Sequence, residues 1–374
     1  MTVTVVPLVD LRWQHCEIES ELLPRLVDLM RTGQFVLGQP VARFEEEFAA
    51  FCGVRFCRGV ANGTDAIELA LRAGGIGAGD EVVVPANTFI ASASAILRTG
   101  ATPRLIDCDP VHQLLDPEQL EAVSSPRTRA VLAVHLFGQL APMTRIATVA
   151  ESLHLRVFED AAQSQGASQG SLGMGRFGVA TATSFYPGKN LGAYGDGGAV
   201  LTDDHRCAAA VSQLRDHGST SKYRHERVGM NSRLDALQAL VLRAKLAHLP
   251  EWNRLRQGAA ARYQQLLADV PGVALPAVMA GNIHVWHLYV VRVQGRDRIA
   301  ELMQADGIGV GKHYPLPLHL QPALAFLGYR PGDFPEAERA SEEVLSLPLY
   351  PGIEAAAQER VVDALRAALS RAGT

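Results

Sequence analysis

Short apolar runs alternate with amphipathic stretches between residues 58 and 160, and this alternation constrains the fold more than any other feature of the sequence. The apolar runs, which predict strands, occupy residues 58–61, 81–85, 103–107, 130–135 and 155–160. Helical patterns separate them at residues 66–73, 91–98, 117–123 and 142–153. Strands that alternate with helices form a largely parallel sheet covered on both faces, and ligands bind beyond the carboxyl ends of its strands. The sequence therefore predicts an α/β fold with its ligand site at that edge of the sheet.

The rest of the chain predicts two amino-terminal helices and a less regular carboxyl-terminal part. The helices cover residues 10–31 and 40–51. Beyond residue 198 we expect strands at 199–202, 285–293 and 309–314, and helices at 204–216, 233–248, 251–269, 298–306 and 355–371, with Pro250 interrupting the long helical pattern. A length of 374 residues is typical of two domains. We place the change near residue 240, with a large domain at 1–240 and a smaller α+β domain at 241–374.

Charge and cysteine content argue against several classes of partner. The net charge is -4 with both signs spread along the chain, so neither nucleic acid nor an anionic membrane is expected as the main partner. No run approaches the length of a membrane span, and residues 1–7 lack the regions of a signal peptide. Five scattered cysteines match no zinc framework, and His284 and His287 would face opposite sides of a strand. We therefore expect a cytoplasmic protein without a metal site.

One lysine stands in a glycine-rich turn between two apolar segments. The run SFYPGKNLGAYGDGG covers residues 184–198 and carries Lys189, with apolar residues before it at 179–185 and after it at 199–202. A lysine between buried strands is costly unless it has a chemical task, and glycines let a backbone approach a ligand. We therefore interpret Lys189 as a lysine that forms a Schiff base.

Three other features follow predicted strands, and each has an ordinary structural explanation of its own. The turn NGTD at 62–65 could bind an anion at a helix start, although by itself it is more simply an N-cap. Phe89 could stack on a planar ring or belong to the core. The segment EDAAQ at 159–163 could supply a carboxylate that keeps a ring nitrogen protonated, or a helix-capping Asp.

Together with Lys189 these features supply the parts that pyridoxal phosphate requires. Their combination is a more specific signal than any one of them. A phosphate cradle, a stacking face, a partner for the pyridine nitrogen and an imine-forming amine occur in one α/β domain. A nicotinamide oxidoreductase is disfavoured. Its glycine motif fits only at 173–178, where GMGRFG has no strand before it and no helix after it.

Four stretches resemble the DegT/DnrJ/EryC1/StrS sugar aminotransferases, a family of fold-type I pyridoxal-phosphate enzymes. They are ANGTDA at 61–66, EDAAQ at 159–163, SFYPGKNLG at 184–192 and GMNSRLDALQ at 229–238. The resemblance extends from about residue 38 to 351. It implies a large domain with a mostly parallel central sheet flanked by helices, and a smaller α+β domain. One departure is Asn62, where the family often has Ser, and this affects one expected phosphate contact.

The resemblance also implies roles for individual residues. Lys189 would bind the cofactor covalently and shuttle protons, and Asp160 would pair with the ring nitrogen. Gln163 would contact the ring hydroxyl, and Phe89 would stack on the ring. The residues that would bind the phosphate are Gly63, Thr64 and Ser184, with Asn231 reaching it from the neighbouring subunit of a homodimer.

The resemblance further implies an amine transfer from L-glutamate to a nucleotide-linked keto sugar. Dehydrases of the family carry His where this chain has Lys189, so the lysine favours transamination. The run HYPLPLHLQP at 313–322 resembles members that act on dTDP-3-keto-6-deoxyhexoses. His313, Tyr314 and Tyr186 are candidate sugar contacts, and Lys222 could meet the diphosphate or be an ordinary surface lysine. The alternatives are the same chemistry at C4 of a 4-keto sugar, or a non-catalytic, cofactor-holding regulatory protein.

Overall fold

A seven-stranded sheet forms the centre of the computed structural model, which describes residues 5–373. The strand order is β1-β9-β8-β5-β4-β2-β3, and β9 alone runs against the other strands of this sheet. The strands are β1 (Phe56–Val60), β2 (Glu81–Pro85), β3 (Thr102–Ile106), β4 (Thr128–Val134), β5 (Arg156–Asp160), β8 (Ala180–Ser184) and β9 (Gly198–Thr202). The predicted mostly parallel α/β fold is confirmed.

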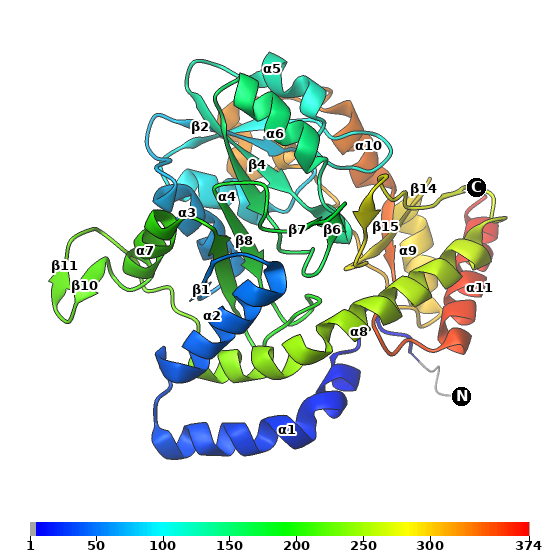
Figure 1. Ribbon diagram of the computed structural model, residues 1–374. Helices are drawn as coiled ribbons and strands as arrows, with labels where there is room; N and C mark the ends of the chain where they lie inside the picture. Colours follow the sequence, from blue (N-terminus) through cyan, green and yellow to red (C-terminus); the bar gives the residue numbers. More distant parts are fainter. Residues whose placement is uncertain (1–4, 374) are drawn as a thin grey trace.

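Helices cover both faces of this sheet (Figure 1). Alternate strand residues enter two different cores, as the two-residue period of a strand requires. Val83, Val131 and Val157 pack in one core, whereas Val82 and Val84 pack in the other. The first core includes α2 (Gly38–Cys52), α6 (Met143–Ser152) and the first half of α8 (Ala236–Leu267), and the second includes α3 (Gly63–Ala73), α4 (Ile90–Arg98) and α7 (His205–Leu214).

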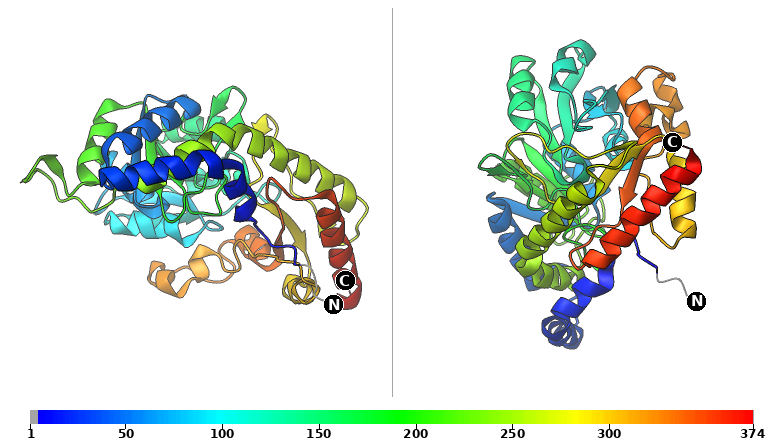
Figure 2. Two further views of the ribbon diagram at one scale, coloured as in Figure 1. Left: turned by 90° about the horizontal axis from the view of Figure 1, so that it is seen from below. Right: turned by 90° about the vertical axis from the view of Figure 1, so that its right-hand side faces the viewer.

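A three-stranded antiparallel sheet with its own core forms the smaller part of the molecule. Its strands are β12 (Val273–Ala274), β14 (Tyr289–Val293) and β15 (Val344–Leu347). The helices α9 (Arg296–Ala305) and α11 (Ala355–Ala372) pack on it, together with the second half of α8 (Figure 2). Helix α8 therefore contributes to the cores of both parts, and it crosses residue 240 without a break. The division at that residue stays a prediction.

The remaining elements are short or peripheral. Helix α1 (Leu11–Thr32) lies against α8, where Trp13 meets Trp252 with ring centroids 6.2 Å apart. The hairpin β10 (Ser219–Ser221)–β11 (Arg224–His225) projects from the body beside α7 (Figure 1). The others are α5 (Leu120–Val123), β6 (Ser168–Gln169), β7 (Leu172–Gly173), β13 (Asn282–Ile283), α10 (Pro335–Glu343) and the 3-10 turns Pro117–Gln119, Leu136–Gly138, Leu318–Leu320 and Pro322–Leu327.

Several expected elements are wrong in detail. Pro250 does not interrupt the long helix, because residues on both sides of it, such as Leu249 and Trp252, are buried in the core and hold the turn in place. Residues 309–314 form no strand, and only Gly311 makes a single bridge, to Ser346. The strand expected from residue 285 begins at Tyr289, so His284 and His287 precede it.

Within residues 5–373, none of the helices is long and apolar enough to cross a membrane. The first four residues, on which the expectation about a signal peptide partly rests, lie outside the described range.

Candidate active site

A cavity of about 500 Å³ opens where the strands β1, β4, β5 and β8 end. This is the edge at which parallel sheets bind ligands. Ten of the residues predicted from the sequence line it: Gly63, Thr64, Phe89, Asp160, Gln163, Ser184, Tyr186, Lys189, His313 and Tyr314. The fold therefore brings together residues that are up to 251 positions apart in the chain, between 63 and 314.

Lys189 projects from the tight turn that follows β8. Its backbone N–H donates to the carbonyl of Tyr186 at 2.8 Å, and a side chain at Gly192 would collide with the carbonyl of Pro187. Lys245 of α8 stabilises the turn, because its Nζ donates to the Gly192 carbonyl at 2.7 Å. Burial lowers the pKa of Lys189 to about 8, although the nearby Asp160 carboxylate acts in the opposite direction. An amine with this pKa is partly neutral near pH 7.5 and can act as a nucleophile or base.

The first turn of α3 makes an anion-binding corner against the end of β8. Asn62 caps this helix, since its Oδ1 accepts the Asp65 N–H at 2.8 Å. A Cβ at Gly63 would lie 2.6 Å from the Cβ of Ser184, so only glycine allows this approach. The first amides of a helix have no intrahelical acceptor, and they point with the positive end of its dipole toward an anion. Gly63, Thr64 and Ser184 thus form a corner that suits a phosphate.

Asp160 is the last residue of β5, and its carboxylate is held at both oxygens. Ser92 of α4 donates its hydroxyl to Oδ2 at 2.7 Å, and the Ala162 N–H donates to Oδ1 at 3.2 Å. Both Asp160 and Ser92 are buried. A carboxylate fixed in this way can keep a ligand's basic nitrogen protonated.

Gln163, Tyr314 and Phe89 form a connected group on the cavity wall. Gln163 accepts the Phe137 N–H through Oε1 at 2.6 Å, and its Nε2 donates to the hydroxyl oxygen of Tyr314 at 3.1 Å. The ring of Phe89 lies 5.2 Å from that of Tyr314, tilted by 33°. Burial raises the pKa of Tyr314, so its hydroxyl stays neutral and can donate a hydrogen bond.

Three histidines line the cavity, His135, His287 and His313, and of these the sequence pointed only to His313. His313 approaches Ser346 Oγ at 2.8 Å, and burial together with the charge of Lys189 lowers its pKa to about 4. His287, which we did not predict, has its Nδ1 3.3 Å from Oδ1 of Asn190. Burial, and after it the charge of Lys189, lowers the pKa of His287 well below its ordinary value. The imidazoles of His287 and His313 are both neutral at physiological pH.

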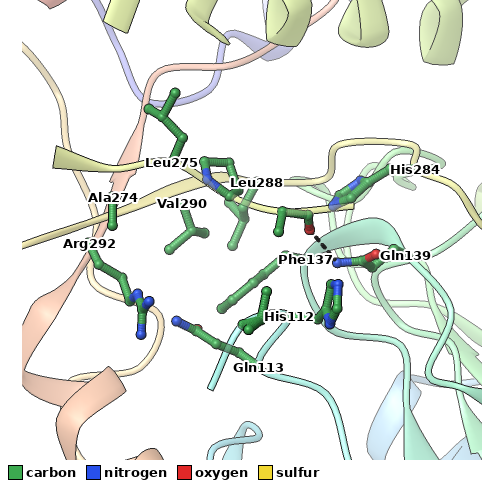
Figure 3. A pocket seen from close by; sticks show the side chains of 13 residues that line it. His112, Gln113, Phe137, Gln139, Ala274, Leu275, His284, Leu288, Val290 and Arg292 are labelled. Atoms are coloured by element: carbon green, nitrogen blue, oxygen red, sulfur yellow. Dashed lines mark hydrogen bonds between the residues drawn. The ribbon is translucent and has the colours of Figure 1, made fainter. Parts of the chain in front are cut away.

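His284 faces a different and much smaller cavity, shown in Figure 3. This second cavity has a volume of about 30 Å³ and lies where the loop at Phe137 meets β14. Gln139 crosses one side of it and donates to the carbonyl of Ala277 at 3.0 Å. A space of this size holds one or two water molecules and no cofactor. The part of the chain that the structure describes contains no group of three or more His, Cys, Asp or Glu that could hold a metal ion.

Two predicted residues lie away from the cavity of their own chain. Lys222 is exposed on the β10–β11 hairpin, with Nζ 5.3 Å from the ring centre of Tyr223. Asn231 is exposed and forms a bridge to Asp216. Their expected roles depend on a second subunit and stay predictions.

The residues of the large cavity fit pyridoxal phosphate. The α3 corner accepts a phosphate because residue 63 has no side chain, the fixed Asp160 carboxylate suits a protonated pyridine, and Lys189 supplies an amine of lowered pKa. The volume of about 500 Å³ is typical of small-molecule sites.

Comparison with known proteins agrees with this chemistry. A model of the DegT/DnrJ/EryC1/StrS aminotransferase family matches residues 16–366. A dTDP-3-amino-3,4,6-trideoxy-alpha-D-glucose transaminase from Streptomyces venezuelae is 45% identical over 361 residues, which cover 96% of this chain and 95% of that relative. A pleiotropic regulatory protein from Geobacillus stearothermophilus is 44% identical over 360 residues, covering 96% and 97%.

A solved structure is similar over almost its whole length. The crystal structure of DesV from S. venezuelae, in complex with a ketimine intermediate, matches with a TM-score of 0.95 and 44% identity and covers 97% of this chain and 98% of that one. The chain therefore belongs to the DegT/DnrJ/EryC1/StrS aminotransferase family and is a pyridoxal-phosphate-dependent enzyme of this sugar aminotransferase family.

Proposed function

We propose that this chain transfers the amino group of L-glutamate to a dTDP-linked 3-keto-6-deoxyhexose, giving the dTDP-3-amino-3,6-dideoxyhexose. The main support is the cavity in which Lys189, Asp160 and the first turn of α3 meet. A lysine at position 189 can carry an amine-transfer reaction through both of its halves, whereas a histidine there could not form the covalent link. The S. venezuelae relative acts on a dTDP-3-amino sugar, and this supports carbon 3 as the position of the new amine.

When bound in this cavity, pyridoxal phosphate supplies an electron sink for negative charge at the substrate carbon that carries the amine. Gly63, Thr64 and Ser184 would hold its phosphate, and Asp160 would keep a proton on its ring nitrogen. Gln163 has one Nε2 hydrogen left for the ring hydroxyl, because the other goes to Tyr314.

Lys189 would move the protons of both half-reactions through its Nζ. It takes the α-proton of glutamate in the first half and returns a proton to the sugar carbon in the second. A pKa of about 8 suits this exchange, because both protonation states are populated near neutral pH. His287 and His313 beside it are neutral, so neither offers a second positive charge to which the substrate anion could bind.

The sugar would meet residues on the outer wall of the cavity. Tyr186 is 59% exposed there, and His313 and Tyr314 come from the opposite, carboxyl-terminal part of the chain. These three side chains offer hydroxyl and imidazole groups to the hydroxyls of a hexose.

We also propose a homodimer in which each cavity is completed by the other subunit. Tyr223 in the turn of the β10–β11 hairpin and Val228 just after the hairpin are 85% and 87% exposed, and large apolar side chains this exposed favour a partner surface. Asn231 of one subunit would reach the phosphate in the other, and Lys222 would meet the diphosphate of the nucleotide.

Mixed dimers test the shared site. Lys189→Ala and Asn231→Ala proteins should each be inactive alone. After subunit exchange, a heterodimer should regain one intact site, so an equal mixture should recover about a quarter of the wild-type activity. A mixture that stays inactive, although native mass spectrometry shows the heterodimer, would contradict the proposal.

Product regiochemistry tests the reaction. Purified protein with glutamate should aminate dTDP-3-keto-6-deoxyhexose faster than its 4-keto isomer, as read by NMR of the product. Faster turnover of the 4-keto sugar would indicate that the enzyme introduces the amine at C4. A coloured protein that aminates neither sugar would indicate a cofactor-holding regulatory protein, and a Lys189→Ala protein with undiminished turnover would refute the assignment of the lysine.

A further inference from the structure

Two buried hydroxyls form a hydrogen-bonded series that ends at the Asp160 carboxylate. Ser92 Oγ lies 2.7 Å from Oδ2 of Asp160, and Thr88 Oγ1 lies 3.1 Å from Ser92 Oγ. Ser92 is fully buried, and Thr88 is 3% exposed. Thr88 lies between β2 and α4 and Ser92 lies in the first turn of α4, whereas Asp160 ends β5. The contact therefore joins the first turn of α4 to the end of β5, at the edge of the sheet where the cavity opens.

The hydroxyl protons of Thr88 and Ser92 have only one possible arrangement while Asp160 is ionised. A carboxylate is only an acceptor, so Ser92 must donate its single hydroxyl proton to Oδ2. Ser92 then has only lone pairs left for Thr88, and Thr88 must be the donor of the second bond. The polarity runs from Thr88 through Ser92 to Asp160, and each bond strengthens the next.

The other groups around Asp160 do not replace these donors. Lys189 and Tyr314 are titratable neighbours of Asp160, and the charge of its carboxylate acts to raise the pKa of each. Glu159, the preceding residue of β5, points into a separate network, in which His135, Thr181 and the amides of Gly175 and Phe177 surround it. Besides the hydroxyl of Ser92, the carboxylate of Asp160 receives only the weaker bond from the Ala162 amide at 3.2 Å among the hydrogen bonds of residues 5–373.

We propose that Ser92, supported by Thr88, is a positioning residue that holds the Asp160 carboxylate as a weak base, so that the proton shared with the cofactor's ring nitrogen stays on the nitrogen. The proposal rests on the assignment of Asp160 in the proposed function and extends it. A carboxylate that accepts hydrogen bonds has a lower affinity for a proton. Loss of the Ser92 donor should therefore move the shared proton toward Asp160 and weaken the electron sink.

The decisive measurement is the protonation of the ring nitrogen itself. Enzyme reconstituted with ¹⁵N-labelled pyridoxal phosphate should show a protonated ring nitrogen by NMR in the wild type. In Ser92→Ala the signal should shift toward that of the neutral pyridine, and the cofactor should dissociate about tenfold more readily, as expected for the loss of a hydrogen bond to a charged group. Thr88→Val should shift the signal in the same direction by less, and Thr88→Ser, which restores the hydroxyl, should return it to the wild-type position.

Ser164→Ala is the matched control. Ser164 is also fully buried in the loop after β5, but among the described residues its hydroxyl donates only to the Ala161 carbonyl at 3.5 Å and to the sulfur of Met174 at 3.8 Å. It should leave both the ¹⁵N signal and cofactor retention unchanged. Thermal unfolding of each variant shows whether it is folded, and Thr88→Val remains informative if Ser92→Ala is not.

A wild-type ¹⁵N signal in both Ser92→Ala and Thr88→Val would overturn the proposal. An equal shift in Ser164→Ala would also overturn it, because the effect would then come from loss of buried packing. In either case a wild-type enzyme that aminates its keto sugar, and a Lys189→Ala variant that does not, would leave the proposed function standing.

Discussion

Lys189 owes its expected reactivity to its surroundings. Burial lowers its pKa to about 8, and only the neutral amine attacks an aldehyde. The neutral fraction of such an amine falls about tenfold for each pH unit below 8. Apo protein mixed with pyridoxal phosphate should therefore take it up at a rate that rises to about pH 8 and then levels off. Stopped-flow absorbance measures this rate, and a rise that continued to the ordinary lysine pKa would contradict the prediction.

Gly63 is a second residue of the site, and its lack of a side chain lets α3 approach the end of β8. A methyl group there would lie 2.6 Å from the Cβ of Ser184 and separate α3 from the end of β8. Gly63→Ala should therefore lose affinity for pyridoxal phosphate by about tenfold or more, as measured by equilibrium dialysis.

Gly258→Ala provides the control for that substitution. Gly258 lies in α8, and beyond the adjacent residues and backbone of this helix no described atom lies within 4 Å of the Cβ that alanine would add. This change should leave cofactor affinity unchanged and stabilise the protein by about 0.5–1 kcal/mol, because alanine favours a helix. Equal losses of affinity in the two variants would indicate that the corner formed by α3 and β8 is not the phosphate site.

At the level of elements, α1 and α8 each have a proline in the helix interior that does not break the helix. Pro250 lies inside α8 and Pro24 inside α1, both exposed. A proline removes one helical hydrogen bond, so Pro250→Ala and Pro24→Ala should each stabilise the protein, by about 1 kcal/mol or more. The midpoint of urea unfolding gives the comparison. A lower midpoint for Pro250→Ala would mean that the proline shapes a bend that the core requires.

The sequence predicted the elements of the large sheet well because local pattern and tertiary position agree there. Strands such as β2, with valines at 82–84, are largely apolar, since both of their faces are buried. The carboxyl-terminal part was harder to predict. Strand β15 follows α10 directly, without a turn residue to mark its start, and residues 309–314 have a strand-like composition but pair only at Gly311.

The residues of the active site likewise fall into those that a local sequence pattern places and those that only tertiary contacts place. Residues in loops after predicted strands, such as Asp160 and Thr64, could be placed from the sequence because parallel strands end at one edge. His287 could not, because its position depends on a bend at Trp286, where φ is 48°, and on a contact with Asn190. No local pattern carries that information.

At the scale of the whole molecule, three buried clusters account for the packing, and α8 belongs to two of them. Its first half, including Leu242 and Leu249, packs on the large sheet. Its second half, including Tyr263 and Leu267, packs on the small one. The two parts of the active site that lie on either side of the cavity, near Lys189 and near Tyr314, are thus connected by one rigid element.

A helix shared between two cores has a consequence for folding cooperativity. Neither part can unfold completely without removing packing from the other, so scanning calorimetry of the apo protein should show one transition whose van't Hoff and calorimetric enthalpies agree. Two resolved transitions would show that the halves of α8 act independently. By the same reasoning, fragments ending and beginning at residue 240 should each fail to fold alone, since the cut falls inside α8. In a chimaera with a relative, neither part could then be replaced by the relative's counterpart unless the whole of α8 is replaced with it.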